Sequence, residues 1–270
     1  MELIKPQVLQ KLKVQVLQSI YENANTGRSL YLVRHQTTHK TYALKLFDIS
    51  LNSESHIRNE MIALNRLPFS VAPHVHAYEH FENKLALLID WIDGKSFSEK
   101  FRELPKDKFE VKERLFALMN AAERLRSLHF KKIFHRDIKP ENLIVDGDKA
   151  KSSVWIIDFG NSTQKRSLDE GTINYRAPEQ YLALNFPIDS KTDVFSLAQV
   201  AWLLLTGSPA QLLPNQQCTD WLDPDYPFFA VDTEYSHDLF KLLESATQFN
   251  PKQRKDIHSF IQELKRLCRR

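Results

Sequence analysis

The chain is poor in cysteine, with only Cys218 and Cys268 among its 270 residues. Two cysteines do not make a disulfide framework, and neither lies beside the pattern of a catalytic thiol. The first residues, MELIKPQVLQKLK, also lack the apolar core of a secretory signal peptide. We therefore expect a cytoplasmic protein in a reducing compartment, with delivery into another cell as an effector left open.

Long apolar runs are missing too. The longest, LALLI at 85–89 and VAWLLL at 200–205, are far shorter than the roughly 20 residues that a membrane-spanning helix needs. We also find no internal repeat and no low-complexity linker. A hydrophobic fraction of 42% and a charged fraction of 26% are typical of a globular protein with one large or two-lobed core.

Neither sign of charge dominates, because 37 Lys and Arg face 34 Asp and Glu, for a net charge of +3. The basic residues are scattered, so no nucleic-acid partner is expected. The basic end, KRLCRR at 265–270, is predicted to be the last turn of a helix, where the helix dipole favours cations. A docking tail is the alternative interpretation of that end.

The first ninety residues show the period-two pattern of strands, interrupted by one helical pattern. Val14, Val16 and Ile20 predict a first strand, which is followed by the turn NANTG. In HIRNEMIALNRL, at 56–67, the apolar residues recur at helical spacing. Further strands are predicted at SLYLVRH (29–35), at TYALKLF (41–47) and in two apolar segments that end with LALLIDWI (85–92).

Beyond this region the apolar spacing becomes helical. The stretch VKERLFALMNAAERLRSLHF, at 111–130, predicts a long amphipathic helix. The stretch DVFSLAQVAWLLLTG, at 193–207, is apolar nearly all round and predicts a buried helix that stops at Gly207. Together the patterns predict an α+β chain with a small strand-rich lobe (1–92) and a larger helical lobe (93–270).

Three motifs follow one another in the second lobe: HRDIKPENLIV at 135–145, WIIDFG at 155–160 and GTINYRAPE at 171–179. In this order they resemble the catalytic loop, the metal-binding motif and the end of the activation segment of eukaryotic-type protein kinases. The spelling HRDxKPEN is similar to that of the serine/threonine branch. The resemblance covers nearly the whole chain and implies a single bilobal protein kinase domain at 1–270.

The resemblance implies roles for the polar residues of these motifs, because phosphoryl transfer depends on positioning and charge stabilisation. Asp137 would accept or orient the proton of a serine or threonine hydroxyl of a protein substrate, and Lys139 would offset charge on the γ-phosphate of ATP. Asn142 and Asp158 would bind Mg²⁺, or alternatively Mn²⁺, since such cations prefer oxygen ligands. Thr172 would hydrogen-bond to Asp137 and Lys139.

A lysine for the ATP phosphates is expected in the small lobe, and Lys45 in TYALKLF fits this role. Ala43 would contact adenine from the same side of the strand, because side chains alternate with a period of two. Glu60 falls on the apolar face of its predicted helix, where a carboxylate needs a partner. The resemblance implies that this partner is Lys45.

The spacing within the family also implies an adenine site. Ile89 follows Glu60 by 29 residues and resembles the gatekeeper position. Leu30 precedes Lys45 by 15 residues and would cover the adenine ring. The backbone groups that would bind the adenine edge belong to the hinge residues Asp90, Trp91 and Ile92.

Glycine is scarce in ENANTGRSLYLV, at 22–33, where the family has a glycine-rich phosphate loop. The three glycine positions correspond to Asn23, Asn25 and Arg28, and Gly27 lies one place out of register. Asparagine tolerates the left-handed backbone region, so Asn23 and Asn25 are expected to keep part of the loop's shape. Two interpretations of Arg28 stay open: contact with the triphosphate, or a solvent-facing side chain.

Other residues are expected to hold the large lobe together or to regulate it. Asp193, at the start of the buried helix, would brace the backbone of the catalytic loop, and Glu179 would pair with Arg254. Arg136 would receive a phosphate carried by the activation segment. The candidate phosphorylation sites are Ser162, Thr163 and Ser167.

Other interpretations compete with these. The HxHxxxH pattern of His74, His76 and His80 resembles a metal-binding pattern. A metal site is not favoured, however, because no cysteine or well-spaced carboxylate completes the ligand set. For the function, the alternatives are a pseudokinase or nucleotide-binding scaffold of the same fold, and a small-molecule kinase. The intact lysine, asparagine and aspartates favour an active enzyme, and GTINYRAPE favours a protein substrate.

Overall fold

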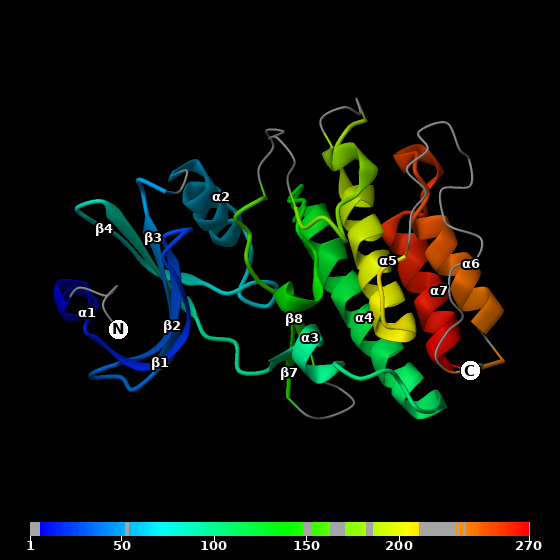
Figure 1. The fold of residues 1–270 in the computed structure, drawn as a ribbon, viewed down its shortest axis with the longest axis horizontal. Coiled ribbons are helices and arrows are strands. Elements are labelled where there is room, and N and C mark those ends of the chain that lie inside the picture. Colours follow the sequence, from blue (N-terminus) through cyan, green and yellow to red (C-terminus); the bar gives the residue numbers. More distant parts are fainter. Residues whose placement is uncertain are drawn as a thin grey trace. The chain divides into compact units, whose positions relative to one another are not determined.

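The computed structural model describes residues 6–51, 54–147, 153–162, 171–181, 186–210, 231, 233–234 and 236–269. It divides the chain into two compact units, Met1–Ile92 and Asp93–Arg270. The first unit is built on a β-sheet and the second mainly on helices (Figure 1). The predicted α+β class, with a strand-rich region followed by a helical one, is confirmed.

The first unit contains a five-stranded antiparallel sheet in the order β1-β2-β3-β5-β4. Strands β2 and β3 cover the predicted segments at 29–35 and 41–47, and the side chains of β2 alternate between half-buried and buried, as a period of two predicts. The strands are β1 (Val14–Asn23), β2 (Arg28–His35), β3 (Thr41–Asp48), β4 (Val75–Phe81) and β5 (Lys84–Asp90).

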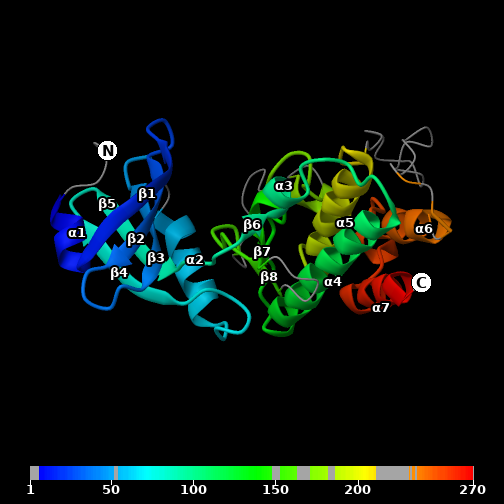
Figure 2. The ribbon, with the colours of Figure 1, turned by 90° about the horizontal axis from the view of Figure 1, so that it is seen from below.

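Two helices lie on opposite sides of this sheet (Figure 2). Helix α2 (Glu54–Asn65) matches the helical spacing of the sequence. Helix α1 (Pro6–Leu12) is not predicted by the pattern, because only Val8 and Leu12 of its seven residues are buried. It packs on a core cluster that includes Tyr31, Val33, Leu44 and Leu88.

Strand β1 departs from the predicted alternation. Val14 is buried, but the side chain of Ile20 is 39% exposed. The register with β2 shifts twice along the strand, first between Val16 and Gln18. Such irregularities turn the following side chains toward the other face of the sheet. The strict alternation of the sequence pattern therefore does not continue beyond Val16.

Helices α4, α5, α6 and α7 lie side by side in the second unit (Figure 1). Helix α5 (Ser190–Thr206) is buried along most of its length, as its nearly uniform apolar sequence predicts. It ends at Gly207 with φ of +89°, a left-handed conformation that favours glycine. The other helices are α3 (Phe97–Lys100), α4 (Lys108–Phe130), α6 (Ser236–Ala246) and α7 (Ile257–Arg269), and α7 has the predicted basic last turn.

Short strands and single helical turns carry the sequence motifs in the second unit. A small sheet has the order β6-β7-β8. In the part of the chain that the structure describes, no helix is long and apolar enough to cross a membrane. These elements are β6 (Lys95–Ser96), β7 (Leu143–Asp146), β8 (Ser153–Ile156) and the 3-10 turns η1 (Pro140–Asn142), η2 (Pro178–Gln180) and η3 (Pro251–Gln253).

Candidate active site

Lys45 on β3 and Glu60 on α2 form a buried ion pair in the first unit. Lys45 Nζ lies 2.5 Å from Glu60 Oε1, and the two side chains are 11% and 1% exposed. A buried charge without a partner is strongly destabilising, so each group holds the other in place. The pair of Lys45 and Glu60 that the family resemblance implies is therefore present.

The strand register places other predicted nucleotide residues on the Lys45 face of the sheet. Leu30 is paired with Lys45 between β2 and β3, and Ala43 is paired with Ile89 between β3 and β5. Directly paired residues point to the same face, as do residues two apart in a strand. These four side chains therefore share the face opposite the one that α1 covers. Ile92, half-buried, ends the first unit.

The carboxylate of Asp90, at the end of β5, is fully engaged. It accepts hydrogen bonds from Lys40 Nζ at 2.9 Å, from His76 Nε2 at 2.8 Å and from the backbone amide of His74 at 2.9 Å. Burial alone would raise the pKa of Asp90, but these hydrogen bonds hold that pKa below its usual range. The described residues contain no cluster of three or more His, Cys, Asp or Glu that could hold a metal. The ring of His76 is hydrogen-bonded to the Asp90 carboxylate.

The turn between β1 and β2 corrects the expectation for its asparagines, since neither Asn23 nor Asn25 has a positive φ. Asn23 stays extended because it pairs with Arg28 as the last residue of β1. Gly27 takes the left-handed conformation instead, with φ of +60°. Its carbonyl accepts a hydrogen bond from the amide of Asp48 at 2.8 Å, and a Cβ on it would lie 2.6 Å from the Cβ of Asp48. Gly27 therefore docks the hairpin onto the end of β3.

Three predicted catalytic residues of the second unit form one hydrogen-bonded cluster. The amide and the hydroxyl of Thr172 donate to Asp137 Oδ1 at 2.9 and 2.8 Å. Lys139 Nζ donates to Thr172 Oγ1 at 3.2 Å and lies 3.3 Å from Asp137 Oδ2. The predicted hydrogen bonds of Thr172 are therefore present, and both oxygens of the Asp137 carboxylate have a partner.

A close approach of two segments brings Thr172 to this cluster. Gly171 has φ of +83°, and a Cβ on it would lie 2.8 Å from the carbonyl oxygen of Arg136. The buried Gln180 donates to the same carbonyl oxygen at 2.7 Å and accepts from the amide of Ala177 at 3.0 Å. The sequence motifs do not indicate this role of Gln180. In the sequence it is only a polar residue that follows GTINYRAPE.

Asn142 and Asp158 provide the oxygen donors that Mg²⁺ prefers. Asn142 Nδ2 donates to the backbone carbonyl of Asp137 at 2.9 Å, so the amide oxygen of Asn142 is left for a cation. The backbone amide of Ile157 donates to the carbonyl of Asn142 at 3.0 Å, which ties the two motifs together. Asp158 has φ of +66°, an uncommon conformation that recurs at functional sites. The residues present therefore fit this cation.

Asp193 of α5 braces the catalytic loop, as predicted. Its carboxylate accepts from the backbone amides of His135 at 2.9 Å and Arg136 at 2.8 Å, and from His129 Nε2 at 2.8 Å. Full burial would raise the pKa of Asp193, but the hydrogen bonds, with His129 the largest, hold that pKa below its usual range. The sequence motifs do not indicate the contact of His129 with Asp193, although a histidine on the buried face of α4 is a signal for a polar partner.

The predicted pair of Glu179 and Arg254 is also present, and both side chains are fully buried. The guanidinium donates to the two carboxylate oxygens at 2.6 and 2.7 Å. Thr192 adds a hydroxyl hydrogen bond to Glu179 at 2.8 Å. Bidentate geometry of this kind is the strongest form of such a pair, so it fixes η2 against η3 and α5.

Of the candidate phosphorylation sites, only Ser162 lies within the described residues. Its hydroxyl donates to the carbonyl of His135 at 3.5 Å. Thr163 and Ser167 lie outside the described residues. Arg136, which is predicted to bind a phosphate group carried by the activation segment, is buried and has φ of +67°.

Comparison with known proteins agrees with the geometry of both units. The model of the protein kinase domain family matches residues 25–264. The chain therefore belongs to the protein kinase domain family, and the resemblance based on the three motifs is confirmed. The sheet-containing first unit and the helical second unit are consistent with the bilobal fold of that family.

The relatives support the serine/threonine branch of the family. The chain is 27% identical over 206 residues to a calcium and calcium/calmodulin-dependent serine/threonine-protein kinase of Lilium longiflorum, covering 73% of this chain and 38% of that protein. It is 28% identical over 232 residues to an Aurora kinase of Eremothecium gossypii, covering 80% of this chain and 60% of that protein. It is 31% identical over 195 residues to the serine/threonine-protein kinase PknF of Mycobacterium tuberculosis, covering 67% and 40%. These matches span between 38% and 60% of the length of these relatives.

Proposed function

We propose that the chain transfers the γ-phosphate of ATP to serine or threonine hydroxyls of protein substrates. The observation that carries this proposal is the cluster of Asp137, Lys139 and Thr172. It joins a carboxylate, an ammonium and a hydroxyl within hydrogen-bond reach. Groups of these types, held in fixed positions, are what phosphoryl transfer to a hydroxyl requires.

Each member of the cluster has a role in the proposed transfer. Asp137 orients the acceptor hydroxyl and takes up its proton as the new oxygen–phosphorus bond forms. Lys139 stabilises the negative charge of the transferred group. Thr172 holds both side chains from the end of the activation segment, so it links the position of that segment to the catalytic loop.

The metal site in this proposal consists of Asn142 and Asp158. When bound, Mg²⁺ supplies positive charge that stabilises the phosphate oxygens. The hydrogen bond from Asn142 Nδ2 to the Asp137 carbonyl supports the assignment, because it orients the amide oxygen for ligation. Mn²⁺ is proposed as a substitute, since it takes the same oxygen ligands.

The nucleotide site in this proposal uses the Lys45 face of the sheet. Lys45 binds the α- and β-phosphates, and its ion pair with Glu60 keeps it extended. The backbone amide of Asp90 donates to the carbonyl of His74 at 3.0 Å, and the carbonyl of Asp90 is assigned to adenine. The remaining adenine contacts are assigned to Leu30, Ala43 and Ile89 and to the backbone of Ile92.

The glycine-poor turn is proposed to contribute less to phosphate binding than a glycine-rich loop does. The amide of Gly27 donates within the turn and its carbonyl accepts from Asp48, so neither faces a ligand freely. Arg28 is half-buried at the start of β2. Arg28 lies two residues before Leu30 on β2 and so shares the Lys45 face of the sheet, which supports the phosphate-contact interpretation of Arg28.

A phosphotransfer assay with radiolabelled ATP, Mg²⁺ and a generic basic protein tests the proposal. We expect serine or threonine labelling by the wild type. Asp137→Asn and Asp158→Asn should each lower the rate by about 10²- to 10⁴-fold, since the first removes the proposed base and the second a proposed metal ligand. Asp146→Asn, an exposed aspartate at the end of β7, is the matched control and should keep the wild-type rate.

A nucleotide-binding scaffold of the same fold is the second candidate, and the docked hairpin turn favours it. Such a protein would be stabilised against heat by ATP and Mg²⁺ but would transfer no phosphate. If the wild type binds ATP and labels the substrate no faster than Asp137→Asn does, the scaffold replaces the kinase as the function of this chain. Labelling that EDTA does not abolish would contradict the metal assignment.

A further inference from the structure

A buried glutamine lies beside the catalytic loop of the second unit, outside the residues to which the proposed transfer assigns a role. Gln180, the last residue of η2, is fully buried. Its amide nitrogen donates to the carbonyl oxygen of Arg136 at 2.7 Å, and its amide oxygen accepts from the backbone amide of Ala177 at 3.0 Å. One side chain therefore joins the catalytic loop to the end of the activation segment.

The two backbone partners of Gln180 require both halves of its amide group. A carbonyl oxygen only accepts a hydrogen bond and a backbone N–H only donates one, so the side chain between them must supply a donor and an acceptor. Glutamine carries both on one planar group, whereas leucine carries neither and an ionised glutamate carries acceptors alone. A buried backbone group that loses its partner is destabilised, so the local conformation depends on this side chain.

Arg136 is the residue that the contact with Gln180 constrains most directly. Its φ of +67° lies in the left-handed region, which residues other than glycine rarely adopt. Such a conformation persists only where the surrounding contacts impose it. Asp193 accepts from the amide of Arg136 at 2.8 Å, and Gln180 donates to its carbonyl. The peptide groups on both sides of the Arg136 Cα atom are therefore held by buried side chains.

This constraint reaches the proposed base. The carbonyl of Arg136 belongs to the same planar peptide group as the amide of Asp137, so a hydrogen bond to that carbonyl fixes how the chain enters Asp137. The Gln180 amide also lies against Gly171, where a Cβ would come within 2.9 Å of its nitrogen. Gly171 precedes Thr172, whose amide donates to Asp137 Oδ1 at 2.9 Å. The Gln180 amide thus borders the residues that precede both partners of this hydrogen bond.

We propose that Gln180 is a positioning residue, which acts through the Arg136 carbonyl to keep the Asp137 carboxylate in the orientation that an acceptor hydroxyl requires. This role rests on the proposed function, in which Asp137 is the base. Gln180 is buried and is assigned no contact with substrate or nucleotide, so its loss should lower kcat and leave the KM for ATP near the wild-type value. A small displacement of a catalytic group slows a reaction strongly, because the reacting atoms must be aligned.

Gln180→Leu removes both hydrogen bonds and keeps a side chain of similar size. In the phosphotransfer assay we expect kcat to fall about tenfold or more, with a KM for ATP within about twofold of the wild-type value. Amide hydrogen exchange is the second measurement, because it needs no turnover. The amides of Asp137 and Thr172 should exchange at least about tenfold faster than in the wild type. A wild-type kcat, or unchanged exchange of these two amides, would overturn the proposal.

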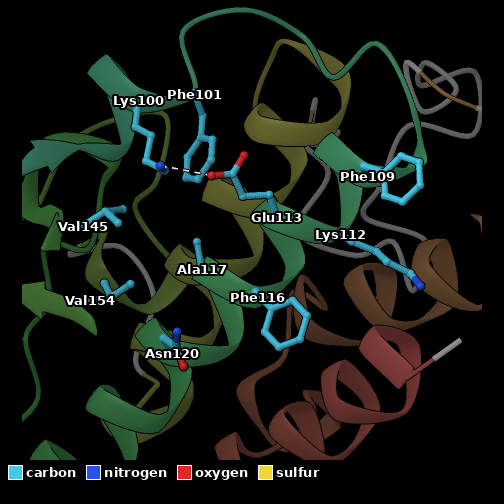
Figure 3. Close-up of a pocket in the computed structure, with 10 residues that line it drawn as sticks. All are labelled: Lys100, Phe101, Phe109, Lys112, Glu113, Phe116, Ala117, Asn120, Val145 and Val154. Atoms are coloured by element: carbon cyan, nitrogen blue, oxygen red, sulfur yellow. Dashed lines mark ion pairs between the residues drawn. The ribbon is translucent and has the colours of Figure 1, made fainter. Parts of the chain in front are cut away.

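Two control variants separate this contact from a general loosening of the second unit. Gln199 on α5 is an almost fully buried glutamine whose amide oxygen accepts from the amide of Ala210 at 2.8 Å. Asn120 on α4 lines a cavity that includes none of the proposed catalytic or metal-binding residues (Figure 3). Gln199→Leu and Asn120→Leu should keep the wild-type kcat. If Gln199→Leu lowers kcat as much as Gln180→Leu does, loss of core packing explains both effects and Gln180 has no positioning role.

Gln180→Glu separates the hydrogen bond to Arg136 from packing, because it keeps the size and shape of the side chain. A neutral carboxyl group has the same donor and acceptor as the amide, but an ionised one cannot donate to the Arg136 carbonyl. Burial favours the neutral form, so the kcat of this variant relative to wild type should rise about tenfold from about pH 8 to about pH 6. Division by the wild-type kcat at each pH removes the titration of groups that both proteins share, such as Asp137.

The outcome with Gln180→Glu also decides the question if Gln180→Leu fails to fold. A relative kcat that stays equally low across this pH range would show that restoring the donor does not restore the activity, and it would overturn the proposal. A wild-type chain that transfers no phosphate would contradict the proposed function alone. In that case the exchange rates of the Asp137 and Thr172 amides still decide whether Gln180 holds the catalytic loop.

Discussion

The hydroxyl of Thr172 donates a hydrogen bond to Asp137 Oδ1 across 2.8 Å, although the two residues are 35 positions apart in the chain. The same hydroxyl accepts from Lys139 Nζ at 3.2 Å. An ammonium, a hydroxyl and a carboxylate in series polarise one another, so the contact is stronger than an isolated pair of neutral groups. It couples the end of the activation segment to the proposed base.

Thr172→Val keeps the shape of the side chain and removes this link. Hydrogen bonds to charged groups are worth about 1.5–3 kcal/mol, so we expect kcat to fall by about 10- to 100-fold. The KM for ATP should stay close to the wild-type value, because Thr172 is not assigned to the nucleotide. Thr172→Ser retains the hydroxyl and should keep most of the activity. A valine variant with full kcat would show that the contact does not support catalysis.

The buried pair of Glu179 and Arg254 should matter for stability rather than for chemistry. Glu179→Gln leaves a buried guanidinium without its counter-charge, which costs about 3–5 kcal/mol in the free energy of unfolding. For a chain of this size that corresponds to a drop in Tm of roughly 10 °C. Differential scanning calorimetry measures it.

A surface pair provides the matched control for this substitution. Glu263 contacts Arg266 at 2.9 Å, and both side chains are more than one-third exposed. Exposed pairs are worth about 0–1 kcal/mol, so Glu263→Gln should change Tm by little. Equal effects of the two glutamine variants would contradict the structural role of the buried pair.

Gly27 should be needed for the hairpin rather than for the nucleotide. Alanine at φ of +60° costs about 1–2 kcal/mol, and its Cβ would meet the Cβ of Asp48 at 2.6 Å. We therefore expect Gly27→Ala to lower the free energy of unfolding in a urea titration. Gly27→Asn should be less destabilising, because asparagine adopts this φ more readily although it has the same Cβ. If alanine has no effect, the turn relaxes without cost.

The sequence predicts much of this fold because several signals agree at the same positions. The order of the three motifs indicates the kinase family, and the apolar helix face around Glu60 requires the partner that Lys45 provides. The helical spacing, the left-handed glycine at Gly207 and the basic end of α7 predict local structure from local chemistry. Each of these predictions depends on residues close in sequence or on a known set of spacings.

The remaining features depend on contacts that no local pattern encodes. Helix α1 is too short to show a period, and it forms because the sheet offers an apolar face. His129 and Gln180 bind residues 64 and 44 positions away. The asparagines of the turn keep an ordinary φ because strand pairing continues to Asn23, which a count of glycine positions does not reveal.

The variant Arg28→Ala tests whether the Arg28 side chain contributes to phosphate binding in place of the missing loop glycines. If its guanidinium contacts the triphosphate, Arg28→Ala should raise the KM for ATP by about tenfold and change kcat little, because a lost charge-assisted hydrogen bond costs about 1.5–3 kcal/mol. Arg34→Ala is the matched control, an exposed arginine on the same strand. Equal KM values for the two variants would leave Arg28 without a role in ATP binding.

The thiol of Cys268 on α7 should react slowly with alkylating reagents. The pH dependence of its alkylation rate measures this directly. Burial raises the pKa of Cys268 to about 11, and the nearby Lys112 offsets this only in part. The thiolate is the reactive form, so a raised pKa means less thiolate at any pH below 11. At pH 8 the alkylation rate should be about a hundredfold below that of a free cysteine, whose pKa is about 8.5.

A Cys218→Ser background isolates the signal, because Cys218 lies outside the described residues. In that background, iodoacetamide labelling followed by mass spectrometry should speed up about tenfold per pH unit until the pH approaches 11. The same chain in urea should label like free cysteine, which controls for the reagent. A rate that levels off near pH 8.5 in the folded chain would show that Cys268 is solvated, and the packing of α7 against α4 would then be looser than its buried face implies.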